Sequence, residues 1–566
     1  MDDGKVFGPT EVYMASRSSE SLTLSRQSSH SYEGHSATDA SDVYQTTPAS
    51  LEYTIAHEQA QSAAELGIAI TTEELSPQWH RAEFYKKCSS FDDSESLSSC
   101  SSVAALYQQS EPLHSFQPPI PSSSGINSLP AEVLSQIFIH CSENIDTLPS
   151  PTSGPLLVAQ VCKRWRQVAI TTPLLWSSLS VLMSDFVCLP HISLVKTWIT
   201  RSASSPLHLS LVYDGSLGYR DGNFGSVQVV SELFIAHSWR WKSVAFNFTH
   251  ANPFLDIISR IPGNGMPILE SVEISLRQRP SSANIVHQSS LLAAFFRCTP
   301  SLREVTCRGV CPIMQLKIPW AQLTHVDLEA PLSASECLEI LRQGRQLLEC
   351  RFHMEHSLHH SLDDCPLIVH PLRSLYISSQ ENLAGFFDHL ILPNLDSLGI
   401  SARWTPARLL PSWPQRHFIS FLSRSACPIT AFSIRCLSIT DAELLECLLY
   451  LSDSLSILEV YVLGCQGAIA ISDTVLNALT YRDCSVLCPR LQQLTLCGCV
   501  TSSDGVLGDM ATSRWRASRR VQVEQDPMVL PLQKLDVTFS SRGHLDDAWK
   551  LRVMHAEGLL GDVGFE

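Results

Sequence analysis

The feature that most constrains the fold is an apolar pattern, L-x-x-L-x-L, that recurs from about residue 180 to the end of the 566-residue chain. Between Leu323 and Leu395 it recurs at steps of 24, 25 and 23 residues, and elsewhere the steps range from 21 to 41. The instances are Trp241-Val244-Phe246, Leu269-Val272-Ile274, Leu302-Val305-Cys307, Leu323-Val326-Leu328, Leu347-Cys350-Phe352, Leu372-Leu375-Ile377, Leu395-Leu398-Ile400, Ile429-Phe432-Ile434, Leu455-Leu458-Val460, Leu491-Leu494-Leu496 and Leu532-Leu535-Val537. Helix-like segments, such as Ser333–Gln346, Asn382–Leu392 and Asp441–Leu451, separate them. The pattern predicts alternating strands and helices.

A strand-then-helix unit repeated every 20 to 29 residues or so is typical of a leucine-rich-repeat solenoid. In such a repeat the alternate apolar side chains of each strand are buried, and the other strand face lines a parallel sheet. The asparagine that many such repeats carry at the turn is mostly absent here, so the repeats resemble an irregular type. The fold class we expect is therefore α/β. The alternative is a generic α/β domain whose strands happen to follow Pro-x-Leu.

The first strands carry a different pattern. Residues 206–211 alternate with period two and precede a turn at Asp214-Gly215, which predicts the first strand of the sheet or its N-terminal cap. We expect Trp239 and Trp241 to cover an end of the solenoid, although either could anchor a ligand.

Composition divides the chain into unequal parts. Charged residues make up 17%, below the roughly 25% that is usual, and 10 of the 28 residues from Ser16 to Val43 are serine. Such a stretch buries too little apolar surface to offset its ordering entropy. We therefore expect residues 1–122 to be a disordered Ser-rich tail that ends in a Pro/Ser linker, Phe116–Gly125. A helical domain over 123–181 and the solenoid over 182–566 then follow.

Charge and targeting signals exclude several classes of protein. The net charge is -16, which disfavours a nucleic-acid-binding protein because gripping phosphates needs a basic face. The start of the chain lacks a signal-peptide pattern, and no apolar run approaches the roughly 18 residues of a membrane span. The 19 cysteines are an odd number and scattered, as in reduced intracellular proteins. We expect a cytoplasmic or nuclear protein with no membrane or nucleic-acid partner.

The segment from residue 126 predicts a small helical unit. Leu129, Val133, Leu134, Ile137 and Phe138 lie on one helical face. Ser128 is the expected N-cap, with Pro130 near the first turn, where proline is tolerated.

A second helix is expected to contain an unbroken apolar stripe. Its members are Val158, Val161, Cys162, Trp165, Val168 and Ala169. Lys163, Arg164 and Arg166 lie off that stripe. Pro173 then begins a short third piece, which ends at Trp176.

Three motifs in this unit together resemble an F-box: Leu-Pro-x-Glu-Val-Leu at 129–134, Val-Cys-Lys-Arg-Trp at 161–165 and Pro-Leu-Leu-Trp at 173–176. The resemblance covers about 55 residues, roughly Ile126–Val181. The loop Ser142–Pro155 is longer than in the compact pattern and resembles a variant common among fungal F-box proteins.

The resemblance implies that the unit docks to a Skp1-like adaptor, and through it to a cullin, while the solenoid captures a target protein for ubiquitination. The residues it implies for docking are Leu129, Pro130, Val133, Leu134, Ile137, Cys162, Lys163 and Trp165, with Trp176 closing the small core. Some of them must belong to the domain core instead. Three alternatives stay open: a helical subdomain packed only on its own chain, a Skp1-binding scaffold outside ubiquitination, and a degenerate α/β enzyme.

No motif predicts catalysis, and no metal ion or cofactor is expected. Nucleotide-cradling glycine loops and the G-x-S-x-G elbow are missing from the sequence. A histidine-rich segment, His353–His360 with His370, could bind a metal or sense pH with Asp363 and Asp364, but we favour an exposed polar loop. Cys484 and Cys488 lack zinc-site spacing. Arg514–Arg520 is a basic patch, interpreted as a solvated insertion or a contact for an acidic partner.

Overall fold

The fold is described from a computed structural model. It describes residues 125–565 except 143–147, 185–186, 216–224, 264, 278–284, 310–312, 356–364, 403–410, 463–468, 483–485 and 521–528. The described residues fall within one compact unit, Thr54–Glu566. The Ser-rich segment 1–122 lies outside the described residues.

The N-terminal part is helical, as expected, but its helices differ in detail. The elements are η3 (Ile126–Ser128), α2 (Ala131–His140), α3 (Gly154–Val161), α4 (Lys163–Thr171) and η4 (Pro173–Trp176). Pro130, not Ser128, is the N-cap of α2, and the Ser128 hydroxyl donates to the Gly125 carbonyl at 2.9 Å. The expected single second helix is two helices, because Cys162 adopts an extended conformation between them.

The rest of the chain forms one long sheet. Fifteen strands of the described residues follow in the order β17-β16-β15-β14-β13-β12-β10-β8-β7-β6-β5-β4-β3-β1-β2, and β9 and β11 form a separate pair. Apart from the antiparallel β1–β2 edge, neighbours in the long sheet are parallel. The strands are β1 (Ser178–Met183), β2 (Cys188–Leu189), β3 (Leu207–Tyr213), β4 (Trp241–Phe248), β5 (Ser271–Leu276), β6 (Glu304–Arg308), β7 (His325–Leu332), β8 (Glu349–Met354), β9 (Ile368–Val369), β10 (Ser374–Ser379), β11 (Leu390–Ile391), β12 (Ser397–Ala402), β13 (Ala431–Arg435), β14 (Ile457–Tyr461), β15 (Gln493–Cys497), β16 (Lys534–Phe539) and β17 (Val563–Phe565).

Each L-x-x-L-x-L segment supplies a strand, and the apolar positions pair in register. Val326 of β7 lies beside Cys350 of β8, which lies beside Leu375 of β10, and all three are buried. Because side chains alternate along a strand, this register buries one face of the sheet and leaves the other open. We call the second face the open face.

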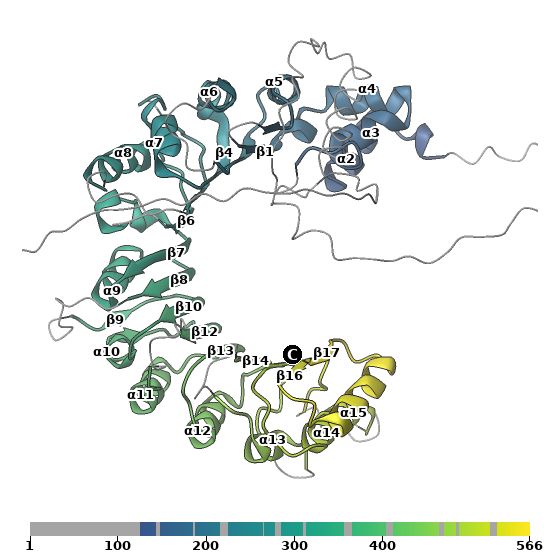
Figure 1. The fold of residues 1–566 in the computed structure, drawn as a ribbon, viewed down its shortest axis with the longest axis vertical. Coiled ribbons are helices and arrows are strands. Elements are labelled where there is room, and N and C mark those ends of the chain that lie inside the picture. The colour runs from purple at the N-terminus through teal and green to yellow at the C-terminus, as the bar shows by residue number, and fades with distance from the viewer. Residues whose placement is uncertain are drawn as a thin grey trace, which may run out of the picture. The chain divides into compact units, whose positions relative to one another are not determined.

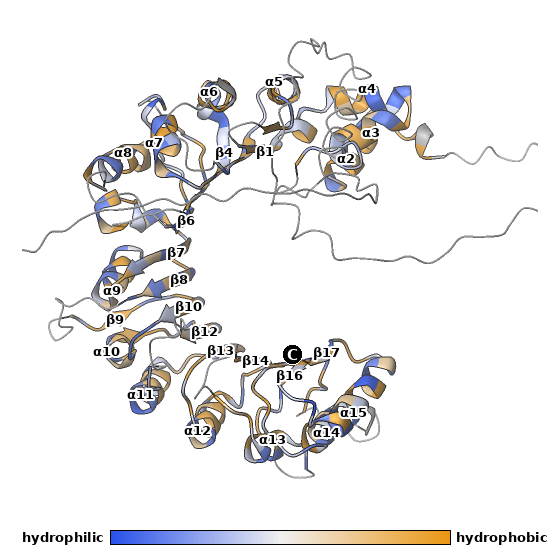
Figure 2. Ribbon diagram, in the orientation of Figure 1, coloured by the Kyte–Doolittle hydropathy of each residue, from blue (hydrophilic) through white to orange (hydrophobic). Residues whose placement is uncertain are grey.

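Helices return the chain between successive strands and cover the buried face (Figure 1). They are α5 (Ile192–Arg201), α6 (Gly225–Ile235), α7 (Ala251–Ser259), α8 (Ile285–Arg297), α9 (Ala334–Gln343), α10 (Ala384–Asp388), α11 (Gln415–Ser425), α12 (Asp441–Leu451), α13 (Asp473–Leu479), α14 (Val506–Arg520) and α15 (Leu545–Ala556), with 3-10 turns η5 (Ser238–Arg240), η7 (Ile313–Leu316) and η8 (Trp320–Gln322). They carry both hydrophobic and hydrophilic residues (Figure 2), as helices with one buried side do.

Local signals explain where several helices start. Ser333 and Thr440 begin α9 and α12 with complete capping boxes, in which Glu336 and Glu443 bond back to the cap. The expected helix 382–392 is shorter, because α10 gives way to β11. No helix in the described part of the chain is long and apolar enough to span a membrane.

The expectation that residues 206–211 form the first strand of the sheet was wrong. The strand that begins the parallel order is β1, and β3 pairs between β1 and β4. Residue 181, where the helical domain is expected to end, lies within β1, so the helical part runs directly into the sheet. Trp241 is fully buried within β4 and donates its indole N–H to the Phe234 carbonyl at 3.1 Å, while Trp239 is exposed.

The basic patch at Arg514–Arg520 is not a solvated insertion at its first residue, Arg514. Its residues end helix α14, and Arg514 is fully buried. The Arg514 guanidinium donates to the carbonyls of Leu479 at 2.6 Å, Leu487 at 2.5 Å and Cys488 at 3.0 Å. Burial lowers the pKa of Arg514 to about 10. This arginine is a structural clamp on the chain between α13 and β15.

Candidate functional site

Helix α2 divides its apolar residues between a core and a surface. Leu134 and Phe138 are buried, and the Phe138 ring lies 4.9 Å from the Trp165 ring. Leu129 and Ile137 are partly buried against the same core. Val133 is 42% exposed, so it is an apolar side chain of α2 that remains available to a partner.

The break between α3 and α4 creates a second exposed apolar position. The Cys162 thiol accepts the Trp165 backbone N–H at 3.4 Å, which caps α4 and ends α3 one residue earlier. Val161, expected in the buried stripe, is 55% exposed, and Leu157, one turn before it, is exposed as well. A continuous helix would have carried Val161 and Trp165 on one face, so the break is what separates them.

Hydrogen bonds hold these helices in place. The Arg164 guanidinium donates to the Leu129 carbonyl at the start of α2. Arg166 Nε donates to the Ala159 carbonyl of α3 at 2.8 Å. The two arginines of α4 therefore bond it to the start of α2 and to α3. This use of their guanidinium groups explains why the two arginines lie off the apolar stripe.

Trp176 joins the helical unit to the sheet. It is fully buried, and its indole N–H donates to the Ala169 carbonyl of α4 at 2.8 Å. Its ring meets Trp198 of α5 edge-on at 4.8 Å, and the Arg201 guanidinium lies 4.6 Å from its centre. Trp198 in turn donates to the Ser178 carbonyl of β1 at 2.9 Å. Trp176 thus closes the small core and also packs on the first strand–helix unit.

This helical unit has a counterpart among known families: residues 126–181 match the model of the F-box-like family. They form an F-box-like domain. The match covers the helical unit and part of β1, a small share of the 566 residues. No curated protein matches the chain.

Within the F-box-like domain, the structure separates the eight expected docking residues into groups. Pro130, Val133 and Lys163 are exposed. The rest contribute partly or wholly to the interior: Leu129, Leu134, Ile137, Cys162 and Trp165. Sequence reasoning missed four exposed apolar side chains, Ile126, Leu157, Val161 and Leu174. The extended conformation at Cys162 decides the exposure of Val161, and no local sequence signal marks it.

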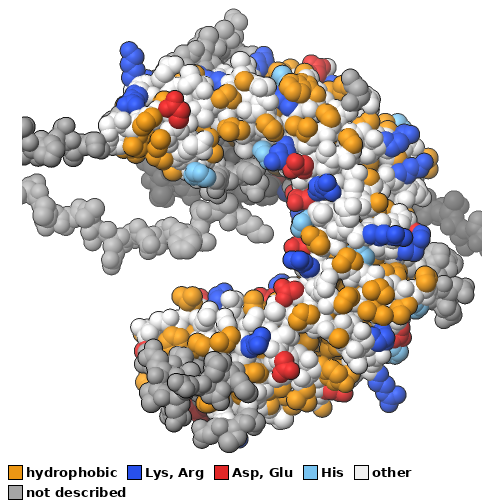
Figure 3. All heavy atoms as spheres, turned by 180° about the vertical axis from the view of Figure 1, so that it is seen from behind, with side chains coloured by type: hydrophobic (Ala, Val, Ile, Leu, Met, Phe, Trp, Pro, Cys, Tyr) orange, Lys and Arg blue, Asp and Glu red, His pale blue; other side chains and the backbone are white. Residues whose placement is uncertain are grey.

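The second candidate surface is the open face of the sheet. Acidic, basic and histidine side chains gather along the sheet side of the middle repeats (Figure 3). Arg308 of β6 is central there, with contacts to Glu273 at 3.0 Å, Glu329 at 3.1 Å and Asp327 at 3.3 Å. These ion pairs connect the side chains of three neighbouring strands across the open face.

An acidic hollow of about 250 Å³ lies on the open face over β6, β7, β8 and β10. Glu304, Asp327 and Glu349 line it, with Arg351 at its far side. His325 stands between two of these carboxylates, with Nδ1 3.8 Å from Glu304 and Nε2 3.7 Å from Glu349. Three carboxylates against one guanidinium give this hollow a negative charge.

A neighbouring hollow of about 320 Å³ lies over β8, β10, β12, β13 and β14. The Arg351 guanidinium stacks 4.7 Å from the centre of the Tyr376 ring, and Arg435 stacks 4.2 Å from the centre of the Tyr461 ring. Gly399 gives the hollow room, because a Cβ there would lie 2.4 Å from the Tyr376 ring. Two guanidiniums, one of them the shared Arg351, and one carboxylate, Glu459, line this hollow, so it is the more basic of the two.

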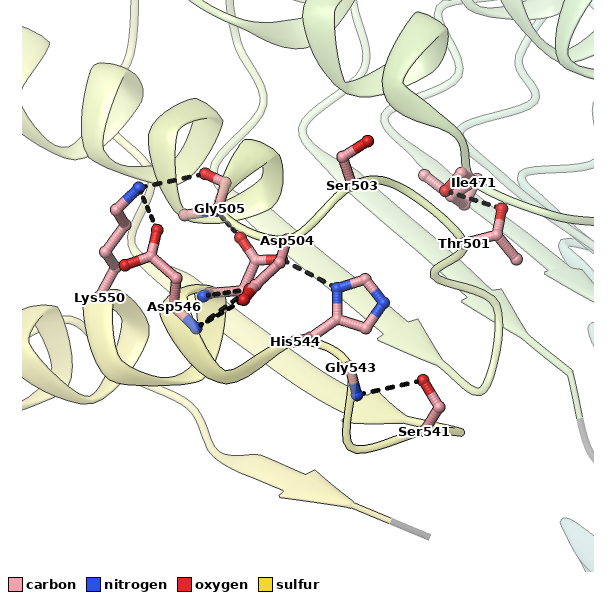
Figure 4. Close-up of polar contacts among 12 residues, drawn as sticks. Ile471, Thr501, Ser503, Asp504, Gly505, Ser541, Gly543, His544, Asp546 and Lys550 are labelled. Carbon is pink, nitrogen blue, oxygen red and sulfur yellow. Dashed lines mark hydrogen bonds and ion pairs between the residues drawn. The ribbon is translucent and has the colours of Figure 1, made fainter.

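A third polar group joins α14 to α15 (Figure 4). Asp504, His544 and Asp547 bring ligand-type atoms within 4.8 Å of one another, the kind of group that can hold a metal ion. Their acceptors already have protein donors: the backbone N–H of Asp547 bonds Asp504 at 3.1 Å, that of Gly508 bonds Asp547 at 2.7 Å, and His544 Nδ1 lies 3.0 Å from Asp547. The backbone N–H groups of Asp547 and Asp546 lower the pKa of the Asp504 carboxyl. The arrangement caps two helices, which is a structural role.

The histidine-rich segment is only partly described. His356, His359, His360, Asp363 and Asp364 lie outside the described residues, as does Cys484. His353 of β8 is buried, with Nε2 3.1 Å from Glu355. His370 is buried beside the Gly344 carbonyl at 2.9 Å, and burial lowers its pKa. His353 and His370 are therefore interior groups rather than parts of an exposed loop.

Proposed function

We propose that this chain is a substrate-recognition adaptor of a Skp1–cullin–F-box ubiquitin ligase. The F-box-like domain binds a Skp1-like protein, and the strand–helix repeats, a leucine-rich-repeat-like solenoid, bind the target on their open face. The F-box-like match over residues 126–181 is the observation that carries this proposal.

The surface of the F-box-like domain supports the docking half. Exposed apolar side chains are normal when they are scattered singly. Here Val133, Leu157, Val161 and Leu174 are all exposed within one small helical domain. A partner that covers them removes apolar surface from water, at about 25 cal/mol per Å². Lys163, exposed at the start of α4, adds a charge to the same domain.

The junction at Trp176 supports the adaptor role. Proximity raises the rate of a transfer only if both components are held in a defined arrangement. The buried contacts of Trp176 with α4 and α5, and of Trp198 with β1, join the domain to the sheet without a flexible linker. A Skp1-like protein docked on the F-box-like domain would therefore hold a bound target at a fixed place.

In this role no residue of the chain makes or breaks a bond. Its contribution is to raise the effective concentration of the target near the ubiquitin-carrying enzyme. The polar groups on the open face suit this purpose, because their charges pair with one another and remain accessible to a binding partner.

A pull-down of the full chain with a Skp1-like protein tests the docking half. Val133→Glu places a carboxylate on the exposed part of α2, and we expect Skp1 recovery to fall at least tenfold, because the charge would have to be buried without a partner. The matched control is Val286→Glu on α8, where the valine is 74% exposed and far along the chain. We expect the control to recover Skp1 like the wild type.

The outcome separates the alternatives. Equal recovery by Val133→Glu and the wild type would remove α2 from the docking surface. Recovery of Skp1 without cullin, and with no change in the lifetime of a co-purified partner, would favour a scaffold outside ubiquitination.

A further inference from the structure

The two hollows on the open face lie side by side and differ in charge. They share Arg351, Ser374 and Tyr376 as walls. The acidic hollow spans β6 to β10, and the basic one spans β8 to β14. A ligand long enough to enter one hollow therefore reaches the other.

The acidic hollow has unused capacity for a cation. Asp327 Oδ1 is a buried atom that accepts no hydrogen bond from the described residues. Asp327 Oδ2 lies 3.3 Å from Arg308 and 4.0 Å from Arg351, so this carboxylate is partly paired at one oxygen only. Glu304 and Glu349 are balanced by His325, which is charged only when protonated. A lysine or arginine side chain in the hollow would pair with the exposed carboxylates of Glu304 and Glu349, beside the Tyr376 ring.

The basic hollow has unused donors for an anion. Arg435 Nε and Ser433 Oγ are buried atoms without a hydrogen-bond partner among the described residues. In the described part of the chain, the Arg435 guanidinium forms an ion pair with Glu459 at 3.7 Å. The floor between the two arginines consists of small residues, Ser397, Gly399 and Ser433. A carboxylate there would pair with guanidinium groups held in position on tyrosine rings.

The distance between the centres of the two hollows sets how far apart the two charged residues of the ligand must be. Neighbouring strands are about 4.8 Å apart, and the centres of the hollows lie two to three strands apart, which is about 12 Å. An extended chain rises about 3.4 Å per residue, so three or four residues span that distance.

We propose that the open face binds an extended segment of the target protein that carries a basic side chain in the acidic hollow and, three or four residues away, an acidic side chain in the basic hollow. The inference rests on the proposed function in taking the segment to belong to the target. It deepens that function by naming the chemistry of the target. Nucleic acid is disfavoured as the occupant, because a phosphate chain would pass over Glu304, Asp327 and Glu349.

Selection from a phage-displayed library of random linear peptides on the purified full chain tests the proposal. We expect enrichment of Lys or Arg paired with Asp or Glu at a spacing of three or four residues. A synthetic peptide with one lysine and one glutamate at that spacing should bind more tightly than the peptide of the same composition in which the two are adjacent.

Charge-reversal variants test each hollow separately. Glu349→Lys should weaken the paired peptide at least fivefold and select peptides in which the basic position becomes acidic. Arg435→Glu should have the converse effect at the acidic position. The matched controls are Asp453→Lys and Arg416→Glu, which make the same charge changes at exposed positions that do not line the hollows. The controls should bind like the wild type.

Skp1 recovery by the same preparations separates this inference from the proposed function and shows that the variants are folded. Absence of enrichment, enrichment without paired charges, or equal binding by the reversal and control variants would overturn the inference. Failure of the wild type to recover Skp1, with charge-paired peptides still selected, would overturn the adaptor role and leave the peptide site.

Discussion

Replacing Trp176 with alanine should loosen the F-box-like domain and the first strand–helix unit together. A fully buried tryptophan removes roughly 200 Å² from water, about 5 kcal/mol at 25 cal/mol per Å², and large-to-small tryptophan substitutions cost 3–5 kcal/mol or so. The change also removes the indole bond to Ala169, the edge contact with Trp198 and the stacking of Arg201. We therefore expect a loss of about 4 kcal/mol in the local free energy of opening.

Hydrogen exchange measured by mass spectrometry on the full chain reads this loss segment by segment. At tenfold per 1.4 kcal/mol, amides of α4 and of β1 should both exchange on the order of a thousandfold faster in Trp176→Ala. Trp176→Phe keeps most of the ring and should raise both rates only about tenfold. Trp239→Ala, at an exposed tryptophan, is the matched control and should leave both segments unchanged.

Faster exchange in α4 with unchanged exchange in β1 would mean that Trp176 serves the F-box-like core alone. In that case the domain would not be held on the sheet through this residue, and a docked Skp1-like protein would have no fixed position relative to the open face.

Three further predictions concern stability and reactivity. Arg514→Ala should lower the melting temperature by an amount equivalent to at least about 2 kcal/mol, because three carbonyls lose the donor that bonds them. This loss should exceed the gain from no longer burying a charged guanidinium. A melting temperature within error of the wild type would show that these three hydrogen bonds do not stabilise the fold. Burial raises the pKa of the Cys307 thiol to about 12, so alkylation of the native protein at pH 8, read by mass spectrometry, should label exposed Cys141 quickly and Cys307 not at all. The free energy of unfolding should fall as pH rises from about 9 to about 12, because the unfolded chain loses the Cys307 proton there while the folded chain keeps it, and thermal melts against pH check this. Ser333→Ala removes the cap of α9 and should cost about 1 kcal/mol in thermal or chemical unfolding, and an unchanged unfolding midpoint would contradict this role of the cap.

Much of the fold could be predicted from the sequence, because the signals were local. The L-x-x-L-x-L segments became strands, and Ser333 and Asp441 lie at the starts of the helices expected there. The F-box-like motifs were recognisable because their residues lie close together along the chain. The second helix was mispredicted, since an apolar stripe through Cys162 is compatible with either one helix or two.

The candidate sites were less predictable. Leu134 and Val133 are adjacent and both apolar, yet one is fully buried and the other is 42% exposed, a difference set by how α2 packs on α4. The hollows on the open face were not anticipated at all. Their walls come from strands about 24 residues apart in the sequence, and the alternating pattern says only that Asp327, Arg351 and Tyr376 point away from the core.

Three features could therefore be read from the sequence alone: the alternation of strands and helices, the apolar positions of each strand and the presence of an F-box-like segment. These depend on periodicity and short motifs, which are written in consecutive residues. Three others emerge only when the chain is packed: which apolar side chains of that segment remain exposed, the attachment of the segment to the sheet through Trp176, and the two adjoining hollows formed by carboxylates and guanidiniums from separate strands. Those features depend on strand register and helix packing, which bring together residues that no local pattern connects.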